Sequence, residues 1–525
     1  MGLRLNGIFK DNMIIQRDKV IRVFGDVDSK SEIKASLLDN SGKMISGGIA
    51  EPVSGHFLVN MTPVEAGGPY KLLVKAGSSS VTIGGIYAGE VWIAGGQSNM
   101  EMPLIRTTDS KDVIDACKEG RVHYYCVPVA DVVNEDTIKA EDESEWVKVS
   151  SKTCANMSGL AYYFSEILEK ELDVHIGIIE CFLGGTSVSS WQSKEALEST
   201  PEGRRYLKEF DKSANELTPT QYDMQKIQFD IADKKYWDEV NESLRENPYM
   251  TYSDIHERFG DGPWPPPCSK DSIRRPSALY EAMVSRITPF SSRGVIFYQG
   301  ENDCETRAGD YDVVFSTLIL NWRQAFMDDE LPFIFAQLPM YISKDRKYMD
   351  FDDLTWPILR SRQYRVSRQV PGAYMAVLID QGEFDNIHPS EKRIPAERFA
   401  NLALRNVYLK SEFLSEYPRC IDVRRGSEGL ELTFRGDFSM LLLKGAFSDD
   451  YGFEMAGDDG EFHTASASVD FDGKTLILSC PNIELPMQVR YAYFSYGNAG
   501  LRGDTGLPAI PFFLKVDTPL GNNPN

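Results

Sequence analysis

The sequence lacks an excess of basic residues. Its 525 residues carry 78 acidic against 56 basic side chains, a formal net charge of −22. Nucleic acids and anionic membrane surfaces bind proteins through basic patches, so neither is expected as a partner. This balance is compatible with a neutral substrate such as a sugar.

Long apolar segments are also missing. No run of 18 apolar residues occurs, so no transmembrane helix is predicted. The opening stretch MGLRLNGIFKDNM has no apolar core of signal-peptide length and has the pattern of a strand. We therefore expect a cytoplasmic protein, or a secreted one if a signal peptide has been removed from this chain.

The eight cysteines form no metal-binding or redox motif. They are scattered singly, without C-x-x-C pairs and without the Cys/His spacing of zinc sites. We expect no metal and no cofactor, and in a cytoplasmic protein the cysteines should be reduced thiols.

The pattern of strands and helices changes twice along the chain. Residues 1–88 contain short alternating segments broken by turn residues, which is typical of a β-sandwich-like domain. Residues 89–411 alternate short apolar strands with helical periods, which predicts a doubly wound parallel sheet. Residues 412–525 return to a β pattern. The expected fold class is α/β, with the parallel sheet flanked by N- and C-terminal β-sandwich-like domains.

Three segments of the middle region carry more specific expectations. Residues 160–172 and 311–326 show the clearest helical periods. Residues from about 200 to 267 form a charged helical insertion that ends in GDGPWPPP, where proline excludes a helix. This Pro-rich end is expected to pack as a fixed loop.

One strand leads directly into a candidate nucleophile. VWIAGGQSNM, residues 91–100, runs an apolar strand into two glycines, Ser98 and the start of a helix. Glycines let the backbone turn sharply and let a substrate come close. The first N–H groups of a helix have no internal partner, so the Ser98 N–H could stabilise an oxyanion beside the hydroxyl. The alternative is that Ser98 is only a helix N-cap.

Two further strand ends offer hydrogen-bond donors. LGGTSVSSW, residues 183–191, places Gly184 and Gly185 after one strand, and FYQGEND, residues 297–303, places Gln299 after another. Ligands of doubly wound sheets bind beyond the carboxyl ends of the strands, where these donors are expected to lie. An ordinary glycine turn and an ordinary polar loop are the alternatives.

Histidine is scarce, and only one of the six histidines follows the last predicted strand of the sheet on a loop. This is His388, and Asp385 three residues earlier could orient its imidazole and favour the imidazolium form. A surface histidine is the alternative. Together with Ser98, these residues would supply a nucleophile, a base and an orienting carboxylate in the order Ser, Asp, His.

With these four blocks, the chain resembles the GDSL/SGNH hydrolases and specifically the sialate O-acetylesterase family. GGQSNM is similar to the nucleophile block of the family, GGTSVSSW to its glycine block, FYQGEND to its third block and DNIHP to its Asp-x-x-His block. The opening FKDNMIIQRDKVIRVFGDV, the central RPSALYEAMVSRITPF and the late VRYAYFSYGNAGLRGDTGLPAIPF are also similar. The resemblance therefore covers nearly the whole chain.

The resemblance implies a role for each of these residues. Ser98 is the implied nucleophile, His388 the general base and Asp385 its orienter. The implied oxyanion hole consists of the Ser98 N–H, the Gly185 N–H and the Gln299 side chain.

Several neighbours of these residues are expected to support the site. Many SGNH enzymes use an asparagine of the third block as a donor, so Asn302 is the alternative to Gln299. Gln97, Asn99 and Glu301 are the expected supporting residues, with Glu301 steadying the nucleophile loop. The family more often has Ser-Asn after this glutamate, which would alter the rim of the pocket without removing a catalytic group.

The implied activity is that of a serine carbohydrate esterase, which removes O-acetyl groups from sugars through an acetyl-enzyme. The implied substrate is 9-O-acetyl sialic acid, or alternatively acetylated xylan or another acetylated oligosaccharide. Trp191, Tyr298 and Trp264 could stack on sugars or pack in the core. A non-catalytic carbohydrate-binding protein is a further alternative, against which the complete Ser, Asp, His set argues. A lipase or thioesterase is another, although no G-x-S-x-G elbow of an α/β-hydrolase occurs. The oligomeric state is not predicted.

Overall fold

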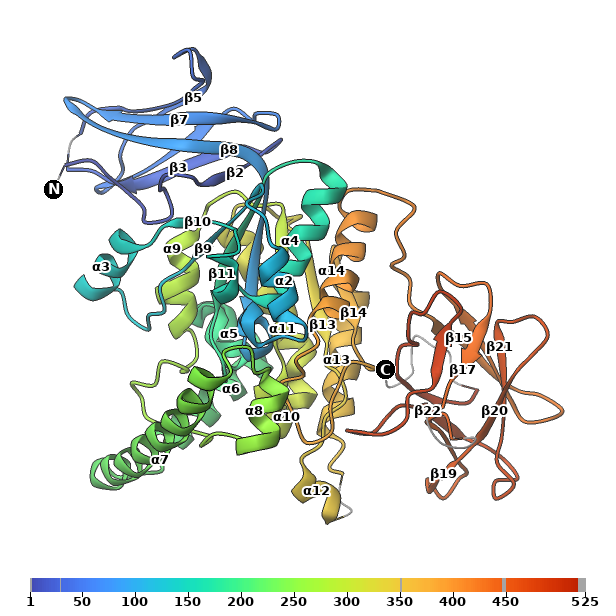
Figure 1. Ribbon diagram of the computed structural model, residues 1–525. Helices are drawn as coiled ribbons and strands as arrows, with labels where there is room; N and C mark the ends of the chain where they lie inside the picture. The colour runs from blue at the N-terminus through green and yellow to red at the C-terminus, as the bar shows by residue number, and fades with distance from the viewer. Residues whose placement is uncertain (1, 29, 350–351, 446–449, 518–525) are drawn as a thin grey trace. The chain divides into compact units, whose positions relative to one another are not determined.

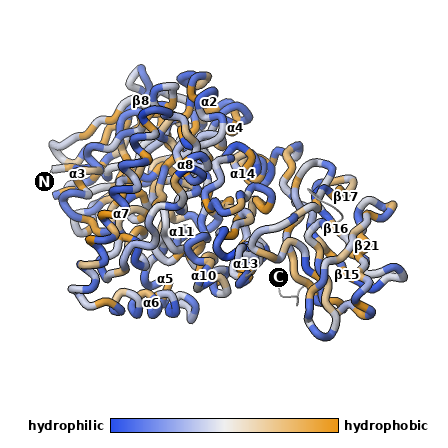
Figure 2. Tube along the Cα trace, turned by 60° about the horizontal axis from the view of Figure 1, so that its bottom comes forward, coloured by the Kyte–Doolittle hydropathy of each residue, from blue (hydrophilic) through white to orange (hydrophobic). Residues whose placement is uncertain are grey.

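The computed structural model describes residues 2–28, 30–349, 352–445 and 450–517, which form two compact units. The first unit contains Met1–Gln299, Val313–Phe333 and Ser390–Glu397. The second contains Gly300–Asp312, Ile334–Pro389 and Arg398–Asn525. No helix among the described residues is long and apolar enough to cross a membrane, and in Figure 2 hydrophobic and hydrophilic stretches alternate along the tube.

The first part of the chain is built from strands, as predicted (Figure 1). Alternation of buried and exposed residues along these strands buries one face of each sheet, as in Ile33–Leu38. One sheet has the order β1-β3-β6, while β4 pairs with β5 and β7, and β8 pairs with β7 and β2. The strands are β1 (Arg4–Leu5), β2 (Ile14–Gln16), β3 (Ile21–Asp26), β4 (Ile33–Leu38), β5 (Met44–Ala50), β6 (His56–Met61), β7 (Gly67–Ala76) and β8 (Ser79–Gly96).

Strand β8 joins this β region to the central sheet of the first unit. It runs unbroken through the predicted domain boundary at residue 88 and ends just before Ser98. The central strands follow the order β10-β9-β11-β8-β12, all parallel except the antiparallel pair at the β10 edge. The strands β9 (Val122–Cys126), β10 (Trp146–Lys148), β11 (Ile176–Phe182) and β12 (Gly294–Tyr298) complete this part. The α/β class is confirmed, with one antiparallel edge strand added.

Helices alternate with these strands, because their apolar residues recur at helical spacing. The two clearest predictions are confirmed at Gly159–Leu172 (α4) and Tyr311–Ala325 (α11). Helix α4 begins at its N-cap Ser158, whose side chain accepts the Ala161 N–H, and packs against β11. The short helices here are α1 (Ser98–Glu101), α2 (Ser110–Ala116), α3 (Glu135–Glu143) and α9 (Ser285–Ile287).

The predicted charged insertion is helical. Its long helix α7 (Pro219–Glu246) starts at Thr218, which forms a capping box with Gln221, and projects from the first unit (Figure 1). Its end packs on the next helix through Val240, Met250 and Ile255. The Pro-rich residues that follow form no helix, as predicted. The other helices here are α5 (Lys194–Glu198), α6 (Pro201–Ala214) and α8 (Tyr252–Phe259).

The second unit combines a smaller α/β part with a C-terminal β region. Its first elements are α10 (Cys304–Arg307), β13 (Phe333–Gln337), α12 (Lys344–Tyr348), α13 (Thr355–Gln369) and β14 (Ala373–Val377), and α14 (Arg393–Asn406) leads into it. The buried Arg360 of α13 donates to the carbonyl oxygens of Ala492 and Phe494, which fixes this helix against the β region.

The C-terminal residues are all β, as the sequence pattern predicts. Two four-stranded sheets have the orders β15-β16-β21-β20 and β19-β18-β22-β24, and β17 pairs with β23. The strands are β15 (Arg419–Arg425), β16 (Leu430–Arg435), β17 (Leu441–Leu443), β18 (Phe453–Ala456), β19 (Phe462–Thr464), β20 (Ser466–Val469), β21 (Thr475–Ser479), β22 (Gln488–Tyr491), β23 (Leu501–Gly503) and β24 (Phe512–Lys515).

Candidate active site

Ser98 lies at the first turn of α1, directly after strand β8. The N-cap of this helix is Gln97, whose side chain makes no capping hydrogen bond, so Ser98 is not the N-cap. Gly96 precedes it with a φ of +130°, and a Cβ there would come within 2.1 Å of the Tyr298 carbonyl oxygen. Only glycine allows this close passage of β8 past β12. The backbone turn at Gly96 thus places Ser98 after the N-cap, and its side chain is half-buried.

The glycine loop after β11 lies beside Ser98. A Cβ placed on Gly184 would be 3.4 Å from the Ser98 Cβ. The Gly184 N–H donates to Glu101 Oε2 over 2.6 Å, and is therefore already used. The N–H of Gly185, by contrast, donates to no acceptor within the described part of the chain. Gly185 is therefore the residue of this loop whose N–H is available to an oxyanion.

Glu101 and Arg274 hold this loop from both sides, and neither was predicted from the sequence. Glu101 accepts the Gly184 N–H, and Arg274 Nε donates to the Gly184 carbonyl over 3.0 Å. Burial raises the pKa of Glu101, while the Gly184 N–H and the Arg274 charge lower it in part. Both peptide polar groups of Gly184 are thus satisfied by side chains.

Gln299 connects the three strand ends. Its side chain is buried, and Nε2 donates to Gln97 Oε1 over 3.2 Å and to the Thr186 carbonyl over 2.9 Å. A primary amide has two N–H groups, and here both have acceptors inside the protein. In this arrangement Gln299 ties the loops after β8, β11 and β12 together, and it would have to release one acceptor to donate to an oxyanion.

Asn99 is held by a buried lysine that sequence reasoning missed. Lys392 Nζ donates to Asn99 Oδ1 over 2.9 Å, and both side chains are about 1% exposed. The same ammonium lies 5.7 Å from the centre of the Tyr298 ring. The only available signal was the position of this lysine four residues after His388, which does not distinguish it from a surface lysine.

Asp385 and His388 share one loop of the second unit. Asn386 shapes this loop: its Oδ1 accepts the His388 N–H over 2.9 Å, and its Nδ2 donates to Glu383 Oε2 over 2.7 Å. Asp385 adopts a φ of +61° and accepts the Lys344 N–H over 2.7 Å. The Lys344 ammonium lies 3.3 Å from the second carboxylate oxygen. Asp385 is thus held by a cation and a backbone donor.

Glu301 and Asn302 also belong to the second unit. They lie in a short 3₁₀ helix, Glu301–Asp303, in which Glu301 is buried and Asn302 half-buried.

The three aromatic residues considered for stacking on sugars differ in exposure. Trp191 and Tyr298 are buried, whereas Trp264 is 54% exposed.

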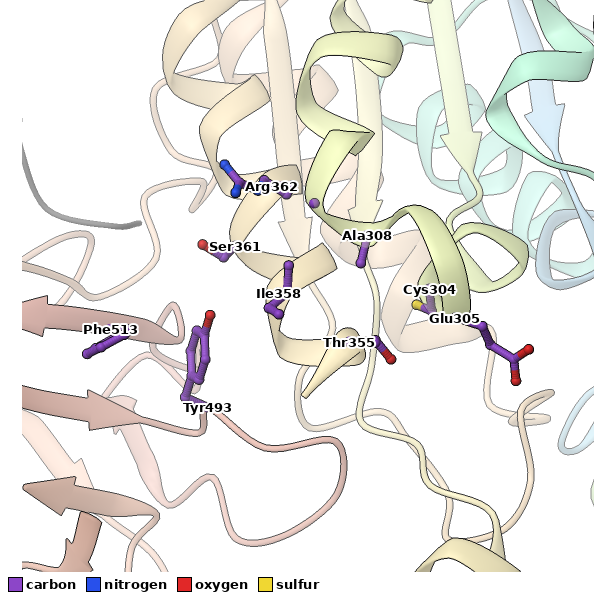
Figure 3. Close-up of a pocket in the computed structure, with 10 residues that line it drawn as sticks. Cys304, Glu305, Ala308, Thr355, Ile358, Ser361, Arg362, Tyr493 and Phe513 are labelled. Carbon is purple, nitrogen blue, oxygen red and sulfur yellow. The ribbon is translucent and has the colours of Figure 1, made fainter. Parts of the chain in front are cut away.

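The structure therefore brings the predicted residues together in two groups. Gln97, Ser98, Asn99, Gly185 and Gln299 lie at the carboxyl ends of neighbouring strands of the first unit. Asp385 and His388 lie on one loop of the second unit, and the orientation of the His388 imidazole by Asp385 stays a prediction. A cavity of about 360 Å³ in the second unit, lined by Arg362, Tyr493 and Phe513 among others, contains none of the predicted site residues (Figure 3).

Among the described residues there is neither a disulfide bond nor a cluster of potential metal ligands. All eight cysteines are free thiols. Across the described ranges, no group of three or more His, Cys, Asp or Glu residues is placed to hold a metal ion.

Comparison with known proteins finds similarity to carbohydrate esterases. Residues 268–355 match the family described as carbohydrate esterase, sialic acid-specific acetylesterase. The mouse sialate O-acetylesterase is 25% identical over 98% of this chain and 95% of its own length. The rat sialate O-acetylesterase is 24% identical over 88% of this chain and 85% of its own. The chain is thus similar to sialate O-acetylesterases over nearly its whole length.

A solved structure has the same fold as this chain. The crystal structure of a carbohydrate acetylesterase from Xanthomonas citri matches with a TM-score of 0.74 and 23% identity, over 97% of this chain and 99% of that protein. The predicted α/β architecture with additional β regions is therefore confirmed.

Proposed function

We propose that this chain is a serine esterase that removes O-acetyl groups from carbohydrates. The main support is the position of Ser98. It follows β8, an inner strand of the first unit's sheet, has no capping role, and lies beside a glycine loop in which the Gly185 N–H has no partner in the described residues. A nucleophile beside a prepared backbone donor is what acyl transfer requires.

Similarity to the sialate O-acetylesterases supports the same reaction for Asp385 and His388. In the proposed mechanism the Ser98 hydroxyl attacks the acetyl carbonyl while His388 takes its proton, and Asp385 keeps the imidazole oriented. The Ser98 and Gly185 N–H groups and a side-chain amide, from Gln299 or Asn302, stabilise the oxyanion. The C–O bond to the sugar then breaks, and His388 returns the proton to the departing sugar hydroxyl.

Water completes the cycle. His388 removes a proton from water, the resulting hydroxide attacks the acetyl-enzyme, and acetate leaves as the Ser98 oxygen recovers a proton. The chain's own residues supply each group in these steps, so the proposal involves no metal or cofactor.

The substrate is proposed to be an O-acetylated carbohydrate, with 9-O-acetyl sialic acid or a similar sugar favoured by the names of the mouse and rat relatives. We propose domain boundaries at residues 88 and 411 for the catalytic region, on the basis of the change in sequence pattern alone.

Release of the carboxylic acid from a panel of acyl esters and a thioester tests the class of substrate, with acetate measured for the acetylated sugars and the corresponding acid for the other two compounds. The panel contains 9-O-acetyl sialic acid, acetylated xylo-oligosaccharides, a long-chain fatty acyl ester and an acyl thioester. The proposal predicts turnover of one or more acetylated sugars with kcat/KM at least about 10³ times that for the lipid ester and thioester. Preference for the long-chain ester or the thioester would contradict it, and an inert protein would favour a non-catalytic, sugar-binding role.

A further inference from the structure

One exposed tryptophan lies against the glycine loop of the candidate site. A Cβ added to Gly185 would come within 2.0 Å of the Trp264 ring, so the indole lies directly on this glycine. Gly185 adopts a φ of +65°, which further restricts the position to glycine. Gly184 lies beside Ser98, and Gly185 is the next residue, with consecutive Cα atoms about 3.8 Å apart. The Trp264 ring on Gly185 is therefore close to the candidate nucleophile.

The exposure of this side chain is unusual for its position. Trp264 is 54% exposed, although one part of its ring covers Gly185. Two other aromatics near the strand ends, Trp191 and Tyr298, are buried and cannot offer a face to a ligand. A large indole surface left open beside a catalytic loop is a typical element of a binding site for a partly apolar ligand.

The segment that carries Trp264 is stiff. Pro263 precedes it and Pro265, Pro266 and Pro267 follow, and proline fixes φ near −65°. A ring on such a segment loses little conformational entropy when a ligand stacks on it.

A cation accompanies the ring. The Arg274 guanidinium lies 5.3 Å from the Trp264 ring centre, and its Nε donates to the Gly184 carbonyl. Neither of its terminal Nη atoms donates a hydrogen bond to any described residue. These two groups can therefore donate to an oxygen of a ligand that lies on the indole.

We propose that Trp264 and Arg274 form the subsite that binds the sugar ring bearing the acetyl group. One face of a pyranose presents C–H groups, which stack on the indole, while a ring oxygen, hydroxyl or carboxylate accepts from Arg274 Nη. This inference rests on the proposed function for the position of the acetyl group at Ser98. It assigns sugar selectivity to the insertion, on which Trp264 lies.

Binding to a non-hydrolysing parent tests this subsite without requiring catalysis. Calorimetry of Ser98→Ala with 9-O-acetyl sialic acid and with acetylated xylo-oligosaccharides gives the reference affinity. The added change Trp264→Ala should weaken binding of the preferred sugar by about tenfold or more, because a central aromatic contact is lost. Trp264→Phe should retain part of the affinity. The matched control is Trp237→Ala on α7, which removes another exposed tryptophan of the insertion.

Kinetics with Ser98 intact separate a binding role from a structural one. Trp264→Ala should raise KM for the acetylated sugar by about tenfold, and should lower kcat/KM for this sugar at least about fivefold more than kcat/KM for ethyl acetate, which carries no sugar ring. Equal losses for both esters would mean that the tryptophan only supports Gly185, and would overturn the proposal. So would unchanged sugar binding by Trp264→Ala, or no binding of any panel sugar by the Ser98→Ala parent. Failure of acetate release alone would contradict the esterase function and leave the binding result readable.

Discussion

At the scale of single residues, the buried Gln299 side chain joins three loops of the candidate site, because its Nε2 donates to both Gln97 and the Thr186 carbonyl. Ser98, Gly185 and Gln299 were predictable because each follows a buried strand, and parallel strands end at the same edge of a sheet. The hydrogen-bond partners of these residues were not predictable. Nothing local indicates that Gln299 donates to both Gln97 and Thr186, because that depends on how three distant loops approach each other.

Gln299 should therefore contribute to stability as well as to activity. Gln299→Ala removes two buried hydrogen bonds, one to the Thr186 carbonyl and one to Gln97, and the loss of a buried hydrogen bond costs free energy. We expect the free energy of unfolding to fall by about 1–3 kcal/mol, measured by urea denaturation. An unchanged value would show that these hydrogen bonds do not hold the loops, and would favour Gln299 as an oxyanion donor only.

Charged residues were the ones that sequence reasoning missed. Glu101, Arg274 and Lys392 act at the site through partners far away in the chain, and no motif distinguishes them from solvated surface charges. Burial decides their role, and burial of a long polar side chain cannot be derived from local hydrophobic periodicity.

At the scale of elements, β11 carries a buried acid, Glu180, that is connected to α1 through Ser158. The Glu180 carboxylate accepts the Ser158 N–H over 2.7 Å and the Cys126 thiol over 3.0 Å. Ser158 in turn donates from Oγ to the carbonyl of Met100 in α1. Burial raises the pKa of Glu180 to about 7, although its hydrogen bonds lower it in part. Glu180 is thus hydrogen-bonded to Ser158, the N-cap of α4, and through Ser158 it is connected to α1.

This acid should make stability depend on pH in a defined direction. Between its ordinary pKa of 4.5 and about 7, Glu180 ionises in the unfolded chain but stays protonated in the folded one, so its contribution to stability falls as pH rises. Glu180→Gln keeps an acceptor and cannot ionise. Relative to wild type, its free energy of unfolding should rise by about 3 kcal/mol between pH 5 and pH 8, measured by urea denaturation.

An exposed glutamate of α4 provides the matched control for this experiment. Glu166→Gln should show no comparable difference from wild type, because its side chain is in solvent. If Glu180→Gln and wild type have parallel stability profiles over this range, the carboxyl is not held protonated by burial.

At the scale of the whole molecule, the periodicity of apolar residues predicted the fold class. It did not predict how the N-terminal β region connects to the central sheet. Continuous apolar runs separated by helical periods indicate a sheet covered on both faces, and alternating runs indicate the β regions at both ends. The sequence pattern does not show that β8 continues from the N-terminal sheet to Gly96, because residues 84–85 and 89 are glycines that look like a break. The contact between Trp264 and Gly185 likewise follows only from tertiary packing.

The central claim is that Ser98 carries out acetyl transfer, and the most direct test compares acetate release by wild type and Ser98→Ala on the preferred acetylated sugar. We expect Ser98→Ala to fold normally and to lose at least ~10³ of kcat, as loss of a nucleophile requires. Ser213→Ala, a change to an exposed serine of α6, should keep wild-type activity. Acetate release by Ser98→Ala at a rate near that of wild type would exclude Ser98 as the nucleophile.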